Sequence, residues 1–73
     1  GLGVSGAVWI GSYLNITPVA VNSLPSCVAG LDGAKAFVNN NATATSFGGA
    51  VTTGGANHHP VYCDGAATAW KQG

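Results

Sequence analysis

The sequence predicts a small all-β module with about four to six short strands. No stretch of a dozen residues places apolar side chains at helical spacing opposite charged ones. Short runs rich in Val, Thr and aromatic residues alternate instead with clusters of Gly, Asn, Ser and Pro. An Asp-Gly pair near the C-terminal end adds a hairpin turn signal. These observations favour short antiparallel strands and hairpins over helices.

The first predicted strand is Ala7–Thr17, where Val, Ile and Leu fall on one face at period two. Pro18 breaks this alternation, and Val19 and Val21 begin a second short extended piece. We therefore expect residues 1–22 to form an extended strand segment that joins a fibre body or a partner, and residues 23–73 to form a small β module ending in a hairpin.

Within residues 23–73, two further strands are predicted, at Lys35–Val38 and Phe47–Thr53. The run Asn39-Asn40-Asn41 is expected to end the first of these, and a Gly-Gly pair interrupts the second. Ser23–Ser26, Gly30–Gly33 and Gly54–His59 have the composition of loops and turns.

A final hairpin is predicted from Pro60–Cys63 and Thr68–Gln72, joined through Asp64-Gly65-Ala66-Ala67. Pro60 is expected at the first position of its strand, where a missing N–H is tolerated. Side-chain parity suggests that Tyr62 and Trp70 form a cross-strand pair.

The charge content excludes several classes of function. The chain has 73 residues, of which two Lys and two Asp are the only charged ones, and its net charge is zero. Nucleic-acid binding is excluded because two cations neutralise too few phosphates. Asp32 and Asp64 both lie in turn sequences and do not form a general acid–base pair. We expect no catalytic activity and no cofactor.

The composition predicts a subunit of an assembly. Leu, Ile, Val and Phe together number sixteen, whereas Gly, which loses the most backbone freedom on folding, numbers twelve. An isolated chain therefore has little apolar material for a core, and a net charge of zero removes the repulsion between copies. We expect identical chains to associate.

The two cysteines, Cys27 and Cys63, have no metal-binding spacing, and we favour two buried free thiols over a structural disulfide. The chain begins at Gly1 without Met, which favours a processed product or a part of a longer chain. Residues 1–31 carry no charge, but glycines and polar residues interrupt the apolar run that a membrane helix requires, so no membrane insertion is expected.

Several blocks of the sequence resemble the C-terminal segments of bacteriophage tail fibre and tailspike proteins. In chain order they are Val21–Ser26, Gly33–Val38, Ala42–Phe47, Thr53–Asn57, Pro60–Gly65 and Trp70–Gly73. The resemblance implies an intertwined homotrimeric fibre-tip module in the virion, assembled in the host cytoplasm. Its partners would be other phage tail or capsid proteins and a glycan or protein on the host surface. The chain departs from the pattern at His58-His59, at both cysteines and in a longer hairpin loop.

Five residues are candidates for receptor contact, because aromatic and imidazole rings offer flat faces and polar tips for recognising sugars. They are Trp9, Tyr13, His58, His59 and Tyr62. A histidine near a trimer axis also fits a metal, but adjacent residues of a strand point to opposite faces, so only one of the pair faces an axis. We assign no metal site, and we expect Trp70 to pack rather than bind sugar.

Two other functions stay open at this point. A capsid decoration or head-fibre protein with a structural role has the same composition and differs only in its place on the particle. An ice-binding or lectin-like module predicts regularly spaced Thr, which Thr43, Thr45, Thr52 and Thr53 do not show.

Overall fold

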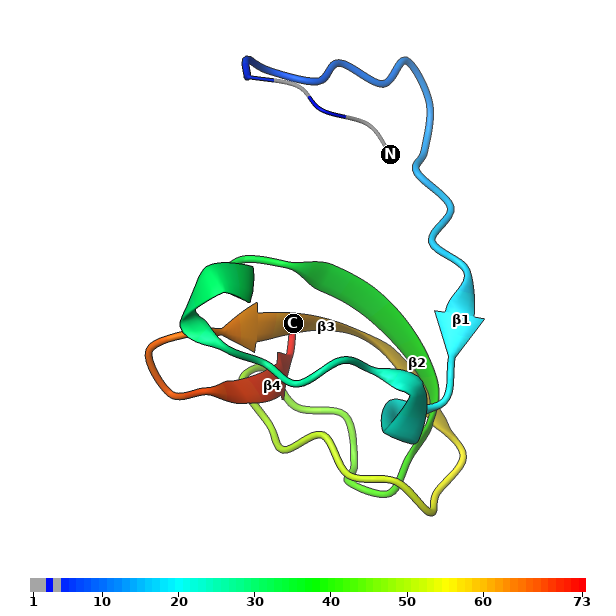
Figure 1. Ribbon diagram of the computed structural model, residues 1–73. Helices are drawn as coiled ribbons and strands as arrows, with labels where there is room; N and C mark the ends of the chain where they lie inside the picture. Colours follow the sequence, from blue (N-terminus) through cyan, green and yellow to red (C-terminus); the bar gives the residue numbers. More distant parts are fainter. Residues whose placement is uncertain (1–2, 4) are drawn as a thin grey trace.

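The computed structural model describes residue 3 and residues 5–73 and contains one four-stranded sheet. Its strands, in spatial order, are β1 (Pro18–Val19), β2 (Lys35–Asn41), β3 (Asn57–Asp64) and β4 (Ala69–Gln72). β1 runs parallel to β2, and the other neighbours are antiparallel (Figure 1). Two short 3₁₀ helices, η1 (Val21–Ser23) and η2 (Ala29–Leu31), precede β2. The predicted β-rich class is confirmed.

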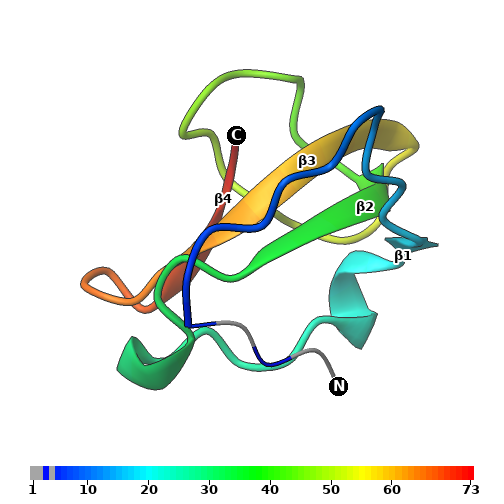
Figure 2. The same cartoon turned by 90° about the horizontal axis from the view of Figure 1, so that it is seen from above.

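Residues 5–17, here called the arm, contain no strand, so the predicted strand Ala7–Thr17 is wrong. The arm leaves the sheet at β1 and passes over β2 and β3 when viewed from above (Figures 1 and 2). A strand requires a neighbour for its N–H and C=O groups, and no part of the described chain pairs with the arm. Gly1, Leu2 and Val4 of the predicted N-terminal segment lie outside the described residues.

Strand β2 contains the predicted Lys35–Val38 but continues through the asparagine run that was expected to end it. The register with β3 shifts between Val38 and Asn41, which marks an irregularity of the β-bulge kind. Beyond the shift, Asn41 pairs with Asn57 and is buried, whereas the Asn40 side chain accepts a hydrogen bond from Val21 N.

The predicted hairpin is confirmed as β3–β4, but β3 begins at Asn57, so the expected loop Gly54–His59 ends three residues early. Pro60 consequently sits inside the strand and not at its start. The carbonyl of Pro60 still accepts a hydrogen bond from Gly73 N. The turn is held by Asp64, whose Oδ1 accepts bonds from Ala66 N and Ala67 N.

The segment between β2 and β3 is a loop, and the predicted strand Phe47–Thr53 is wrong. Its β-type pairing with the sheet is limited to isolated bridges, from Thr53 to Asn41 and from Ala50 to Lys71. Much of its remaining backbone is hydrogen-bonded by buried side-chain amides of the sheet, so no regular ladder forms.

The core of the described chain is small. Its buried apolar residues are Cys27, Val38, Val61 and Cys63. Cys27 and Cys63 form a disulfide with a Cα–Cα distance of 5.4 Å, so the prediction of two free thiols is wrong. Sequence spacing carries no information on this geometry. The segment before η2 brings Cys27 next to Cys63 of β3. The disulfide thus links two parts of the chain where few apolar residues are buried.

Candidate functional site

Strand β3 separates its side chains cleanly between the two faces of the sheet. His59, Val61 and Cys63 are buried on the inner face, whereas His58 and Pro60 are exposed on the outer face. The prediction that the two histidines face opposite ways is therefore confirmed.

His59 belongs to a buried polar network centred on Asn41. The Asn41 amide Nδ2 faces the carbonyl oxygens of Thr43 and Ala50, and Asn41 Oδ1 accepts a bond from Thr52 N at 2.6 Å. These partners fix the orientation of the amide. Since Nδ2 can only donate, His59 Nε2 is the acceptor in their contact. His59 Nδ1 lies 3.4 Å from the Pro60 carbonyl oxygen.

The Gln72 side chain likewise hydrogen-bonds the backbone of the loop between β2 and β3. Its Oε1 accepts a bond from Ser46 N at 2.8 Å, and its Nε2 donates to the carbonyl oxygens of Ala44 and Ala50. Every buried side-chain nitrogen or oxygen in the described part of the chain has a partner. The network thus fixes the loop from residue 42 to residue 56 against the sheet.

The loop holds Phe47 beside β3 and β4. Gly48 N donates to the Gln72 carbonyl, and Gln72 N donates to the Gly49 carbonyl. The neighbouring Phe47 ring lies 6.5 Å from the Tyr62 ring, centroid to centroid, and is nevertheless 88% exposed. An aromatic side chain is therefore presented to solvent on a well-tethered loop.

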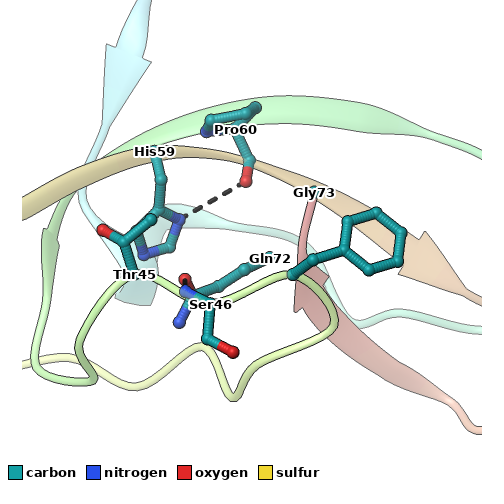
Figure 3. Close-up of a pocket in the computed structure, with 7 residues that line it drawn as sticks. Thr45, Ser46, His59, Pro60, Gln72 and Gly73 are labelled. Atoms are coloured by element: carbon teal, nitrogen blue, oxygen red, sulfur yellow. Dashed lines mark hydrogen bonds between the residues drawn. The ribbon is translucent and has the colours of Figure 1, made fainter.

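A concave site, here called the Phe47 cleft, opens beside this ring. It has a volume of about 220 Å³. Its lining comes from the loop, β3 and the end of β4: Thr45, Ser46, Phe47, His59, Pro60, Gln72 and Gly73. Figure 3 shows His59 and Gln72 between the Thr45–Ser46 segment and Pro60. The lining side chains include no Lys, Arg, Asp or Glu, so the cleft suits an apolar group.

A second concavity of about 340 Å³ lies where the arm meets the sheet. Leu14 and Ile16 of the arm face Phe37 and Pro60 there. Pro60 borders both concavities, which makes one nearly continuous apolar surface on this part of the module.

The charged groups of β3 and β4 lie at the hairpin. Lys71 Nζ and Asp64 Oδ2 form an ion pair at 2.9 Å. The hydrogen bond from Lys71 lowers the pKa of Asp64, with the Ala67 N–H adding to the effect, and the same bond raises the pKa of Lys71. Asp32 Oδ1 accepts a bond from Gly65 N at 2.7 Å. Both aspartates therefore have the turn roles that the sequence predicted.

The structure does not gather the five predicted contact residues into one site. Trp9 and Tyr13 lie on the arm and are 93% and 81% exposed. His58 and Tyr62 are both on β3, where His58 is exposed and Tyr62 is half-buried. His59 is only 3% exposed and its Nε2 is engaged by Asn41, so its place among surface contacts is corrected to a structural one.

Two aromatic assignments also change. Trp70 pairs with Cys63 and donates from Nε1 to the Pro25 carbonyl at 2.8 Å, whereas Tyr62 pairs with Lys71. The predicted Tyr62–Trp70 pair is therefore wrong, and the Trp70 indole is hydrogen-bonded to the segment before η2 instead. Sequence reasoning missed Phe47, because its assignment to a strand gave no reason to expect exposure.

No group of three His, Cys, Asp or Glu side chains suited to a metal ion occurs among residue 3 and residues 5–73. Over the same residues, none of the helices has the length and apolar character needed to span a bilayer. Comparison with protein-family models, with curated proteins and with solved structures returned no match.

Proposed function

We propose that the chain is the distal module of a bacteriophage tail fibre or tailspike and that it works as a homotrimer in attachment to the host surface. The observation that carries the proposal is a coincidence of boundaries. The blocks that resemble fibre ends begin at Val21 and run to Gly73, and the folded module occupies nearly the same residues, starting with β1 at Pro18.

The exposed apolar side chains support the assembly part of the proposal. The arm carries Trp9 and Leu14 in contact mainly with solvent, and the module buries few apolar residues of its own. Large exposed apolar patches on small proteins mark interaction sites. Three copies around one axis would enclose what a single chain leaves open.

The disulfide supports a site of action outside the cell. Disulfides persist in oxidising surroundings such as virion surfaces and are rare in the reducing cytosol. A chain made in the host cytoplasm would therefore complete the Cys27–Cys63 bond during or after release of the particle.

Attachment would be multivalent. Weak contacts of each copy with a surface glycan or protein would be multiplied by their fixed proximity within one fibre tip. The rings of Tyr13 and His58, which are exposed, and of Tyr62, which is half-buried, are the candidates for these contacts, and Trp9 is one unless assembly buries it.

The test is competition. Purified, oxidised module at saturating concentration should reduce adsorption of the phage that carries this chain, and heat-denatured module should not. Labelling of purified particles with an antibody to the module should mark the tail. Labelling of the capsid without competition would contradict attachment and favour a decoration or head-fibre role.

A further inference from the structure

Trp9, the most exposed aromatic side chain of the molecule, lies on the arm, whereas the Phe47 cleft is formed by the sheet and the loop between β2 and β3. Trp9 is 93% exposed on an arm with no charged residue, and the side chains that line the cleft likewise include no Lys, Arg, Asp or Glu. We propose that Trp9 of one copy seats in the Phe47 cleft of a second copy. This inference rests on the assembly part of the proposed function and names the residues through which copies join.

The size of the cleft favours a single side chain as its occupant. Pockets that bind cofactors and drug-sized ligands have volumes of about 300–1,000 Å³. The Phe47 cleft, at about 220 Å³, lies below that range. Its aromatic wall at Phe47 and its rigid wall at Pro60 are the features of pockets that receive an aromatic anchor at protein interfaces.

The geometry of the arm favours a second copy over the chain's own Trp9. Leu14 and Ile16 of the same chain already lie next to Pro60, at the border of the cleft. Trp9 is five residues before Leu14, which corresponds to roughly 16 Å of extended chain. A chain's own Trp9 would reach its cleft only if the arm folded down onto the sheet, whereas the chain before β1 rises away from the sheet (Figure 1).

The chain exposes more surface than a compact monomer would. A compact monomer of this mass is expected to expose about 4,100 Å². The chain exposes 4843 Å². The excess of about 700 Å² is similar to the roughly 800 Å² that one partner contributes to one stable protein interface. Each copy would give one Trp9 and receive another, so it would take part in two such contacts, and a head-to-tail contact closes into a ring when the rotation between copies closes.

The experiment measures self-association of the full oxidised chain by sedimentation velocity across a concentration series. Trp9→Ala and Phe47→Ala should each raise the association midpoint by about tenfold or more, because each removes one half of a buried anchor. The double variant should associate no more weakly than the weaker single variant, since both changes remove the same contact. Tyr13→Ala, on the same arm and similarly exposed, is the matched control and should stay within about twofold.

Five outcomes would overturn the proposal. Four are unchanged association of Trp9→Ala, additive effects of the two single variants, an equal effect of Tyr13→Ala, and a wild-type chain that stays monomeric. The fifth is docking of Trp9 in its own chain, which would appear as a blue-shifted emission that is absent from Trp9→Ala and does not depend on concentration. Circular dichroism confirms that each variant is folded. The attachment proposal fails separately, if an associated wild-type module does not compete with phage adsorption.

Discussion

At the scale of single residues, the fold depends on polar side chains to an unusual degree for so small a chain. Asn41, His59 and Gln72 are buried together with only four apolar residues. The side-chain amides of Asn41 and Gln72 hydrogen-bond the backbone of the loop between β2 and β3, in place of the backbone bonds that a neighbouring strand would make. Networks of this kind stabilise a fold only while every member is satisfied.

Asn41→Ala should therefore be severely destabilising. The change leaves Thr52 N and His59 Nε2 without their partner inside the protein, whereas the Ala50 carbonyl keeps its hydrogen bond from Gln72 Nε2. A loss of about 2 kcal/mol or more in the free energy of unfolding is expected, at about 1–3 kcal/mol for each unsatisfied group. Denaturant unfolding measures it. Asn39→Ala is the control, because Asn39 is on the same strand but makes no side-chain hydrogen bond within residue 3 and residues 5–73. Equal stability of the two variants would refute the role of the network.

The Asp64–Lys71 pair should make hairpin stability depend on pH at the acidic end. The folded state lowers the pKa of Asp64, so the stabilisation is present above the ordinary carboxyl pKa and is lost as the pH falls through the lowered pKa. Asp64→Asn should reduce the melting temperature at neutral pH, and the difference from wild type should shrink in strong acid. A difference that is constant with pH would show that the turn bonds to Ala66 and Ala67, and not the charge, are responsible.

At the scale of elements, one loop and one hairpin are joined by three independent contacts. The disulfide links Cys27 to β3, Asp32 accepts a bond from Gly65, and Trp70 donates to Pro25. The segment before β2, which has only short 3₁₀ turns of its own, is thereby fixed to the β3–β4 hairpin.

Loss of the disulfide should be costly. For a sequence separation of 36 residues, the closed loop removes about 4 kcal/mol of chain entropy from the unfolded state. The double variant Cys27→Ala with Cys63→Ala should lose stability in this range, measured by denaturant unfolding. A reducing agent should destabilise wild type and leave the double variant unchanged. Equal unfolding of oxidised and fully reduced wild type would contradict a structural disulfide.

Gly55 lies where the loop comes close to the backbone of β2 and the residue that follows it, so a substitution there tests this close approach. A Cβ at Gly55 would collide with the backbone of Asn41 and Ala42, whereas one at Gly30 would meet nothing. Gly55→Ala should therefore cost about 1–3 kcal/mol through the forced backbone shift, and Gly30→Ala should change stability by less than about 0.5 kcal/mol. Thermal melting of the two variants provides the comparison, and a harmless Gly55→Ala would mean that the loop lies elsewhere.

Sequence patterns predicted elements whose signals are local. The β3–β4 hairpin followed from Asp64-Gly65 and its flanking strand residues, and the start of β2 followed from Lys35–Val38. The Asn39–Asn41 run was assigned to a turn because asparagine favours turns, but burial of Asn41 overrides that preference. The pairing of Cys27 with Cys63 and the absence of a strand at Phe47–Thr53 depend on contacts distant in sequence, which no local pattern contains.

At the scale of the whole molecule, we propose that the single chain is one subunit of an assembly. The alternation in residues 7–17 has the pattern of a strand, yet the arm lies unpaired with Trp9 and Leu14 exposed. The sequence identified some of the candidate contact residues, because aromatic side chains can be recognised in it. It did not predict that these residues are divided between the arm and the sheet. Both observations are explained if other copies supply the missing neighbours of the arm.

The most direct test of this account is the mass of the intact, oxidised chain in solution, measured by sedimentation equilibrium at micromolar concentration. The account predicts the mass of three chains, with the apolar arm residues protected from solvent in the assembly. A folded, stable species with the mass of one chain would contradict it.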